Sequence, residues 1–351
     1  MPEPARILIV RPSALGDVCR TVPVLAALKR RHPDAYVHWL VNEAFAPAVV
    51  AHPDLSAVIP FPRGRLGAWW RSPSAARELR AWLGSLRAAR YDLVLDCQGL
   101  FRSGLFTRWT GAPRRIGYAN AREMGWLGLN ERVHAPRARH ALDRMMALAH
   151  AAGADPGEPP DLRLYCPAAD REALKPDLAQ ARYALLAPTS RWVGKRWPVE
   201  RFAALATRLL DERLVERVAF VGAASERGQC EPLARLAVAD HRVLDLVGAT
   251  SVGGLMAAVE RAAIVVANDS AALHMAVGFA RPLVALFGPT HVGLVGPYRR
   301  EADVIQKIAP GERLDHKDEA LGRRLMERIS VDEAFAAAAA RMSGADTMSP
   351  C

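Results

Sequence analysis

The chain of 351 residues carries a formal net charge of +10, and 51% of its residues are hydrophobic, which is enough for two domains with separate cores. It has no apolar run of membrane-spanning length and no signal-peptide pattern, and its five scattered cysteines lack metal-ligand or redox spacing, as expected for reduced thiols in a cytoplasmic protein. The charge excess lies in residues 1–165, where 23 Lys and Arg stand against 14 Asp and Glu, whereas residues 166–351 hold 24 against 23.

The basic N-terminal half is therefore expected to face an anionic partner. It contains no nucleic-acid motif and no block of Lys or Arg, so we do not expect it to bind nucleic acid. An anionic membrane surface or an acidic glycolipid fits the charge equally well, and a solvated Arg-rich surface without a partner is the alternative.

Residues 1–165 alternate between strand and helix patterns, as in a doubly wound parallel sheet. Strands are predicted over 6–10, 36–41, 57–60 and 92–96, and helices over 16–31, 43–51, 74–90 and 99–110. We therefore predict an N-terminal Rossmann-like domain over residues 1–165.

A boundary is predicted within residues 151–182, which contain Gly-Glu-Pro-Pro at 157–160 and little apolar periodicity. A second α/β series then predicts strands over 183–187, 216–221, 243–246, 263–267 and 282–286, with helices over 198–212, 228–238, 251–260 and 270–279. This second Rossmann-like domain would span 166–328. A capping box at Ser330–Glu333 predicts a last helix within 329–351, with packing on the N-terminal domain as one option.

The first strand ends in Arg-Pro-Ser-Ala-Leu-Gly-Asp at 11–17, a loop that lacks the G-x-G-x-x-G pattern and so disfavours a nicotinamide-dependent enzyme. Gly16 permits a tight turn before the helix, and Asp17 lies in its first turn. The Asp17 carboxylate could cap the helix or act as a general base on an alcohol, and its two oxygens allow both roles.

Basic residues of the first domain are predicted to lie in loops and to form an anion-binding rim together: Arg63, Arg65, Arg102, Arg114, Arg115 and Arg122. In the second domain, hydroxyl and basic side chains follow the strand over 183–187, namely Thr189, Ser190, Arg191 and Lys195. Hydroxyls and a lysine beside a strand end suit a diphosphate.

A second anion-binding edge is predicted where the strand over 263–267 ends in Asn-Asp-Ser at 268–270, a helix N-cap signal, with His274 one turn into the helix. Glu226 follows the strand over 216–221, where a carboxylate could bind ribose hydroxyls, although a solvated loop position is the alternative.

Taken in order, the motifs resemble those of the bacterial lipopolysaccharide heptosyltransferases, glycosyltransferase family 9, over residues 6 to 300. The resemblance rests on Ser-Ala-Leu-Gly-Asp at 13–17, Tyr-Asp-Leu-Val-Leu-Asp-Cys-Gln-Gly-Leu-Phe-Arg-Ser at 91–103, Thr-Ser-Arg at 189–191 with Lys-Arg-Trp-Pro at 195–198, Asn-Asp-Ser at 268–270 with His274, and Phe-Gly-Pro-Thr at 287–290. Within the family the chain is most similar to heptosyltransferase I, through residues 58–60, Arg63, Arg65, 68–70, 102–103 and 121–123.

The resemblance implies a GT-B fold, with two Rossmann-like domains facing a central cleft. It implies an inverting glycosyltransferase that moves heptose from ADP-L-glycero-D-manno-heptose to the Kdo-lipid A inner core of lipopolysaccharide. No metal or other cofactor would be needed, and the enzyme would act peripherally at the cytoplasmic face of the inner membrane, where its acceptor is anchored.

Carried over by position, Asp17 would be the base that deprotonates the acceptor hydroxyl. The donor would be bound by Thr189, Ser190, Lys195, Glu226, Asp269, Ser270, Ala271 and His274. The acceptor would be bound by Ser13, Gly16, Arg63, Arg65, Arg102 and Arg122.

Two departures from the family pattern concern the donor half: Ala271 stands where glycine is common, and one extra residue precedes Lys195, which leaves the role of Arg191 open. A sister transferase with a different core or glycolipid acceptor, or another sugar donor, remains an alternative. A non-catalytic protein that binds a nucleotide sugar or glycolipid is a further one. Trp69, Trp70 and Trp82 are candidates for contact with the membrane or for the core.

Overall fold

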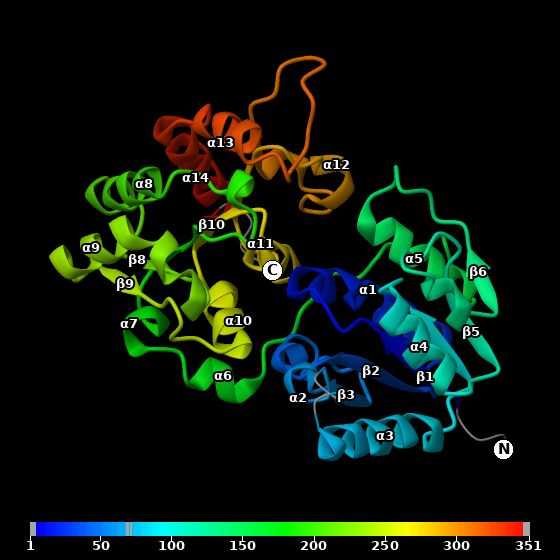
Figure 1. Cartoon of the computed structure of the whole chain (residues 1–351). Coiled ribbons are helices and arrows are strands. Elements are labelled where there is room, and N and C mark those ends of the chain that lie inside the picture. The colour runs from blue at the N-terminus through cyan, green and yellow to red at the C-terminus, as the bar shows by residue number, and fades with distance from the viewer. Residues whose placement is uncertain (1–4, 68–69, 71, 347–351) are drawn as a thin grey trace. The chain divides into compact units, whose positions relative to one another are not determined.

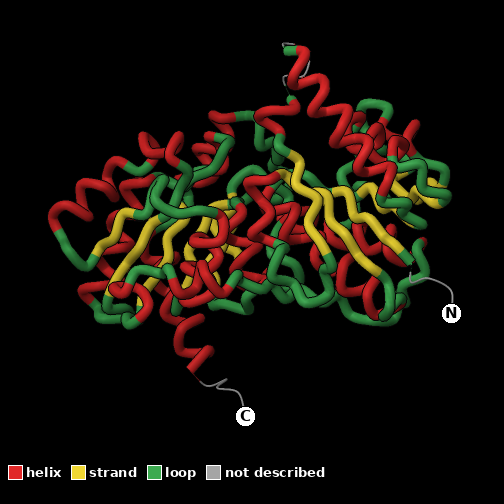
Figure 2. The backbone as a smooth tube through the Cα atoms, turned by 90° about the horizontal axis from the view of Figure 1, so that it is seen from below, coloured by secondary structure: helices red, strands yellow, loops and turns green. Residues whose placement is uncertain are grey.

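The computed structural model describes residues 5–67, 70 and 72–346, and the chain divides into two compact units, residues 1–165 and 166–351 (Figure 1). Each unit contains one six-stranded sheet in which every strand pair is parallel. In Figure 2 helices flank the strands of each unit. The predicted α/β class, with two doubly wound sheets, is confirmed.

The first unit is built on strands in the spatial order β3 (Ala57–Phe61), β2 (Tyr36–Asn42), β1 (Arg6–Val10), β4 (Leu93–Asp96), β5 (Arg114–Tyr118) and β6 (Glu131–Val133). Its helices are α1 (Leu15–Arg31), η1 (Glu43–Ala48), α2 (Arg63–Leu66), α3 (Pro73–Ala88), α4 (Phe101–Trp109), η3 (Gly125–Gly128) and α5 (Ala141–Ala151), where η marks a 3₁₀ helix.

Both faces of this sheet are buried, so its central strand β1 is apolar at nearly every position. Leu8 and Val10 join a cluster with Phe106 of α4 and Leu86 of α3 on one face. On the other face α1 packs beside α5, and the Thr21 hydroxyl donates a hydrogen bond to the Sδ atom of Met145 at 2.9 Å.

The second unit repeats this arrangement with strands in the order β12 (Val304–Gln306), β11 (Leu283–Phe287), β10 (Ile264–Asn268), β7 (Tyr183–Ala187), β8 (Arg217–Phe220) and β9 (Val243–Asp245). Its helices are α6 (Ala168–Glu172), α7 (Pro176–Ala179), η4 (Val193–Lys195), α8 (Val199–Asp211), η5 (Ala224–Gln229), α9 (Glu231–Ala239), α10 (Val252–Arg261), α11 (Ala271–Gly278), α12 (Val292–Val295), η6 (Glu301–Asp303), α13 (Glu319–Glu327) and α14 (Val331–Asp346).

The last helix, α14, begins at the predicted capping box, in which the Ser330 hydroxyl accepts from the Glu333 N–H at 3.2 Å and the Ser330 N–H donates to the Glu333 carboxylate at 3.0 Å. Phe335 and Ala338 of α14 are buried in one cluster with Phe202 of α8. The core-facing side chains of α14 therefore belong to the core of the second unit.

The strand order locates the ligand-binding edge of each unit. In the first unit the order reverses between β1 and β4, and in the second between β7 and β10. Open parallel sheets bind ligands at the carboxyl ends of the strands beside such a reversal. The loops after these four strands carry four of the five sequence motifs, and the fifth, at 287–290, follows β11.

Several elements differ from the expected ones. The segment predicted as a helix over 43–51 is the short 3₁₀ helix η1, and β5, β6 and β12 were not predicted. Arg114 and Arg115, expected in a loop of the anion-binding rim, begin strand β5 and so lie at the amino ends of the strands, away from the ligand-binding edge. There Arg114 forms a bidentate pair with Glu131 of β6, at 2.7 and 2.8 Å.

Within the described residues, no helix is both long and apolar enough to cross a membrane. Trp82 is half-buried and donates from its ring N–H to the Pro60 carbonyl at 3.0 Å, whereas Trp70 is exposed. Trp69 lies outside the described residues.

Two helical glycines give opposite predictions for substitution by alanine. A Cβ at Gly104 of α4 would lie 2.1 Å from the Gly125 carbonyl oxygen, a rigid backbone atom, whereas a Cβ at Gly84 of α3 would meet nothing within 4 Å. We expect Gly104→Ala to lower the free energy of unfolding by 2 kcal/mol or more, on the order of an overpacked core. Gly84→Ala should raise it by about 0.5–1 kcal/mol through helix propensity. Urea denaturation measures both, and a Gly104→Ala protein as stable as the wild type would contradict the close packing of α4 on η3.

Candidate active site

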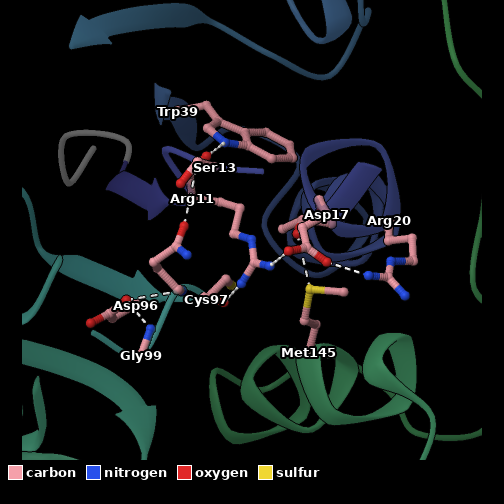
Figure 3. Close-up of polar contacts among 11 residues, drawn as sticks. Arg11, Ser13, Asp17, Arg20, Trp39, Asp96, Cys97, Gly99 and Met145 are labelled. Atoms are coloured by element: carbon pink, nitrogen blue, oxygen red, sulfur yellow. Dashed lines mark hydrogen bonds and ion pairs between the residues drawn. The ribbon is translucent and has the colours of Figure 1, made fainter. Parts of the chain in front are cut away.

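Asp17 lies in the first turn of α1, just beyond the carboxyl end of β1. Its carboxylate accepts from the Arg11 guanidinium at 2.6 Å and also pairs with Arg20, one helical turn further on (Figure 3). The Asp17 side chain is about a quarter exposed, so it remains accessible while two cations compensate its charge. This places a charged oxygen at the ligand-binding edge of the first sheet.

Arg11 also joins the two strands that flank the reversal in strand order. Besides Asp17, its guanidinium donates to the Cys97 carbonyl just after β4 (Figure 3). A second hydrogen bond joins the same two loops: the Ser13 N–H donates to the Gln98 side-chain oxygen at 3.1 Å. These bonds fix the loops after β1 and β4 against each other and orient Asp17 relative to both.

Asp96, the last residue of β4, organises the loop that follows. Its carboxylate is fully buried and accepts from the N–H groups of Gln98 and Gly99, at 3.0 and 2.9 Å, and from the Ser103 hydroxyl at 2.9 Å. Burial raises the pKa of Asp96 to about 6, against the opposing effect of these hydrogen bonds and of the Arg11 charge. Asp96 thereby holds the first turn of α4 at the edge of the site.

A cavity of about 230 Å³ opens beside this loop within the first unit. It is lined by Pro12, Ser13, Asn42, Phe61, Arg63, Gln98, Leu100, Arg102, Ser103 and Glu123. Three of the predicted acceptor residues, Ser13, Arg63 and Arg102, are thus brought together. The two arginines give the cavity a basic rim, and Glu123 adds one carboxylate that can accept hydrogen bonds from hydroxyl groups.

The other predicted acceptor residues lie outside this lining. Gly16 belongs to the first turn of α1, and Arg65 is exposed on α2, where it pairs with Glu78 at 3.5 Å. Arg122 has an exposed side chain, and its backbone N–H donates to the Gly99 carbonyl at 2.9 Å. The expected rim of arginines is therefore reduced to two at the cavity.

In the second unit, Lys195 and Asp269 form the central ion pair of the predicted donor site. The Lys195 ammonium, on η4, lies 2.6 Å from an Asp269 oxygen just after β10, and the two side chains are only 15% and 10% exposed. A cation and a carboxylate that approach from different loops can bind a diphosphate and a hydroxyl-rich sugar, respectively.

Asn268 explains how these loops come together. Its side chain donates to the Pro188 carbonyl at 2.7 Å and accepts from the Trp197 N–H at 3.2 Å, both in buried positions. It therefore ties the end of β10 to the end of β7 and to the segment that carries Lys195. Thr189 and Ser190 follow β7 and are buried at the same edge.

Two buried hydroxyls at this edge have no hydrogen-bond partner within the described residues, those of Ser270 and Thr290. Ser270 is the N-cap residue of α11, yet its side chain does not cap the helix as the sequence signal predicted. Thr290 follows β11 in a loop that Gln306 holds through the carbonyls of Gly288 and Thr290, at 2.7 and 2.8 Å. Unsatisfied buried hydroxyls are costly, and a bound ligand would satisfy them.

The remaining donor candidates are placed as follows. Glu226 is half-buried in η5, and its carboxylate accepts from the Ala223 N–H at 2.9 Å. Ala271 and His274 occupy the first turns of α11, and His274 is buried. Arg191 is exposed, with its guanidinium 5.6 Å from the centre of the Trp192 ring.

Some residues of both half-sites were missed in the sequence. Arg20 lies one helical turn after Asp17, a spacing at which two side chains of a helix meet. Arg11 directly follows the first strand, so parallel-sheet geometry places it at the same edge as Asp17. Both spacings could have indicated the ion pairs. His316 lies in a loop without periodicity and gave no signal. Its ring packs edge-on against the Trp192 ring at 5.3 Å between centres, and burial and the nearby Lys195 ammonium lower its pKa.

Comparison with known proteins identifies relatives along most of the chain. The model of glycosyltransferase family 9 (heptosyltransferase) matches residues 79–321. Lipopolysaccharide heptosyltransferase 1 of Pseudomonas aeruginosa is 32% identical over 301 residues, which cover 84% of this chain and 82% of that protein. Lipopolysaccharide heptosyltransferase 2 of Escherichia coli K12 is 27% identical over 336 residues, covering 90% and 92%.

Solved structures of two E. coli proteins share the fold. ADP-heptose lps heptosyltransferase II superposes with a TM-score of 0.79 at 24% identity and covers 97% of this chain and 99% of that one. The heptosyltransferase WaaC with ADP gives 0.73 at 28% identity, with coverage of 92% and 99%. The expected GT-B fold is confirmed.

The raised pKa of Asp96 predicts a pH-dependent loss of stability. The unfolded carboxyl loses its proton near pH 3.8 and the folded one near 6, so the folded state holds the proton longer and stability falls as the pH rises through this window. We expect the free energy of unfolding of the wild type, relative to Asp96→Asn, to fall by up to about 1.4 kcal/mol per pH unit and to level off above pH 6. Urea denaturation from pH 4 to 8 measures this, and a constant difference between the two proteins would show that Asp96 ionises normally.

Proposed function

Because the chain belongs to glycosyltransferase family 9 and is a heptosyltransferase, we propose that it transfers heptose from ADP-heptose to the Kdo-lipid A inner core of lipopolysaccharide. The observation that carries the proposal is the Asp17 carboxylate, held 2.6 Å from Arg11 in the first turn of α1, four residues after Ser13 of the basic cavity. Similarity to relatives named lipopolysaccharide heptosyltransferase 1 supports the acceptor.

In the proposed reaction a hydroxyl of the acceptor attacks the anomeric carbon of the heptose and passes its proton to Asp17. The bond from that carbon to the diphosphate oxygen breaks, ADP leaves, and the configuration at the carbon is inverted. The pairing of Asp17 with Arg11 and Arg20 keeps the carboxylate fixed so that one oxygen can face the attacking hydroxyl. Arg63 and Arg102 would bind the acidic Kdo sugars at the cavity.

The second unit would hold the donor. Lys195 and the N-terminal N–H groups of α11 would stabilise the charge that develops on the leaving diphosphate. Thr189, Ser190 and Ser270 would donate hydrogen bonds to the donor, and Glu226 and His274 would line its site. Asp269 would accept from sugar hydroxyls while Lys195 compensates its charge. No residue is assigned to a metal, and the protein would act at the cytoplasmic face of the inner membrane.

A sister activity on a different core acceptor is the second candidate. It is favoured by relatives named lipopolysaccharide heptosyltransferase 2, which match 90% of the chain at 27% identity. The two candidates share the donor and differ in the acceptor, so ADP release with deacylated Kdo-lipid A, compared with the same acceptor already carrying one heptose, separates them.

Removal of the proposed base gives the decisive test. We expect Asp17→Asn to lower kcat for ADP release from ADP-heptose and deacylated Kdo-lipid A by at least about 100-fold, the usual contribution of a general base. The affinity for ADP should not change, because Asp17 belongs to the first unit and the donor residues to the second. Asp34→Asn, an exposed carboxylate in the same unit, is the control. If Asp17→Asn turned over like this control, Asp17 would not be the base.

The Lys195–Asp269 pair predicts non-additive effects on ADP binding. Lys195→Met should weaken binding, measured by calorimetry, by tenfold or more, because it removes the cation and leaves Asp269 uncompensated beside the diphosphate. The double variant with Asp269→Asn should recover part of that affinity, since the repelling charge is gone. Lys175→Met, at an exposed lysine of the same unit, serves as control. Strictly additive changes would contradict a shared role of the pair in the donor site.

A further inference from the structure

Helix α4 carries apolar side chains on two sides, only one of which faces the core. Ser103, Phe106 and Thr107 are buried towards the sheet. Phe101, Leu105 and Trp109 follow one another at intervals of four residues and are 49%, 42% and 41% exposed. Residues four apart share a helix face, so these three form an apolar stripe on the outside of the unit.

The segment that adjoins α4 extends this apolar surface. Gly104 of α4 packs directly on the backbones of Gly125 and Gly128, which places η3 alongside the helix. Next to these glycines, Met124 and Leu127 are 58% and 49% exposed. We call the surface formed by Phe101, Leu105, Trp109, Met124 and Leu127 the α4–η3 face.

Arginines surround this face. Arg102 and Arg108 lie on α4, Arg122 precedes Met124, and Arg132 stacks over the Trp126 ring of η3 at 4.6 Å. Over the part of the chain that the structure describes, none of these four guanidinium groups is ion-paired with a carboxylate. Their charge is therefore available to an external anion, unlike that of Arg114, which Glu131 neutralises.

We propose that the α4–η3 face docks the protein on an anionic lipid bilayer, with the apolar side chains entering the headgroup region and the arginines contacting lipid phosphates. An exposed apolar surface within a basic rim is the pattern of proteins that bind the membrane interface. The charge argues for lipid phosphates as the occupant, because a neutral partner would leave the four arginines unused. The net charge of residues 1–165, nine positive, acts in the same direction.

The position of the face agrees with the proposed acceptor, and this part of the argument rests on the proposed function. Arg102 belongs both to the rim of the face and to the lining of the 230 Å³ cavity, and Glu123, next to Met124, lines the cavity as well. A glycolipid held with its acyl chains in the bilayer would thus present its sugars to the cavity without leaving the membrane.

Vesicle sedimentation with the full-length protein tests the docking surface. We expect the wild type to co-sediment with vesicles of phosphatidylcholine and phosphatidylglycerol, less at high salt, and not with phosphatidylcholine alone. The double variant Leu105→Ser/Leu127→Ser should partition about tenfold less, because two apolar side chains no longer enter the interface. Val238→Ser, which removes an apolar side chain 91% exposed on α9 of the other unit, is the matched control and should bind like the wild type.

The proposal would be overturned if the wild type did not bind anionic vesicles, or if the double variant bound them as well as the wild type. It would also be overturned if gel filtration showed an oligomeric wild type and a monomeric double variant, because the face would then be a self-association surface. Transfer to the deacylated, soluble acceptor is measured in parallel and should be the same in the double variant. Vesicle binding without any transfer would refute the proposed function and leave the docking surface standing, whereas transfer without vesicle binding would do the reverse.

Discussion

A carboxylate compensated by basic side chains from a neighbouring segment holds each half-site together. In the first unit Asp17 is paired with Arg11 and Arg20, and in the second Asp269 is paired with Lys195 at 2.6 Å. A carboxylate that is mostly withdrawn from water needs such a partner, because the Coulombic attraction has to offset the lost hydration. The pairs therefore position their loops as well as supplying charge, and the geometry of both sites depends on them.

These pairs form where they do because both sheets have the same strand order. The reversal between β1 and β4, and between β7 and β10, leaves the carboxyl ends of two adjacent strands without a covering connection. In each unit a polar side chain reaches across the reversal and links the two loops. Arg11 does this in the first unit by donating to the Cys97 carbonyl, and Asn268 does it in the second by donating to the Pro188 carbonyl.

The sequence predicted those features that depend on local pattern. The buried strands β1, β4, β7 and β10 were predicted because apolar runs mark them, and the residues after them were singled out for the same reason. Strands β5, β6 and β12 were missed because they are short or carry charged residues such as Arg114 and Arg115. Which arginines line the cavity was beyond prediction as well, since that depends on how α2 and α4 pack rather than on any spacing in the chain.

The structure also changes the meaning of the basic charge in the first half of the chain. Some of the arginines are paired within the unit: Arg11 and Arg20 compensate Asp17, Arg65 pairs with Glu78, and Arg114 pairs with Glu131. Such pairs already cancel within the net charge of residues 1–165, so the remaining nine positive charges come mainly from basic residues without a carboxylate partner. Among the described residues these include Arg63, Arg102, Arg108, Arg122 and Arg132 around α4 and the cavity, beside exposed apolar side chains, and others elsewhere such as Arg77 and Arg80 of α3. Such a local combination attracts an amphipathic anion, whereas a dispersed charge of the same size would act only on the general solubility of the protein.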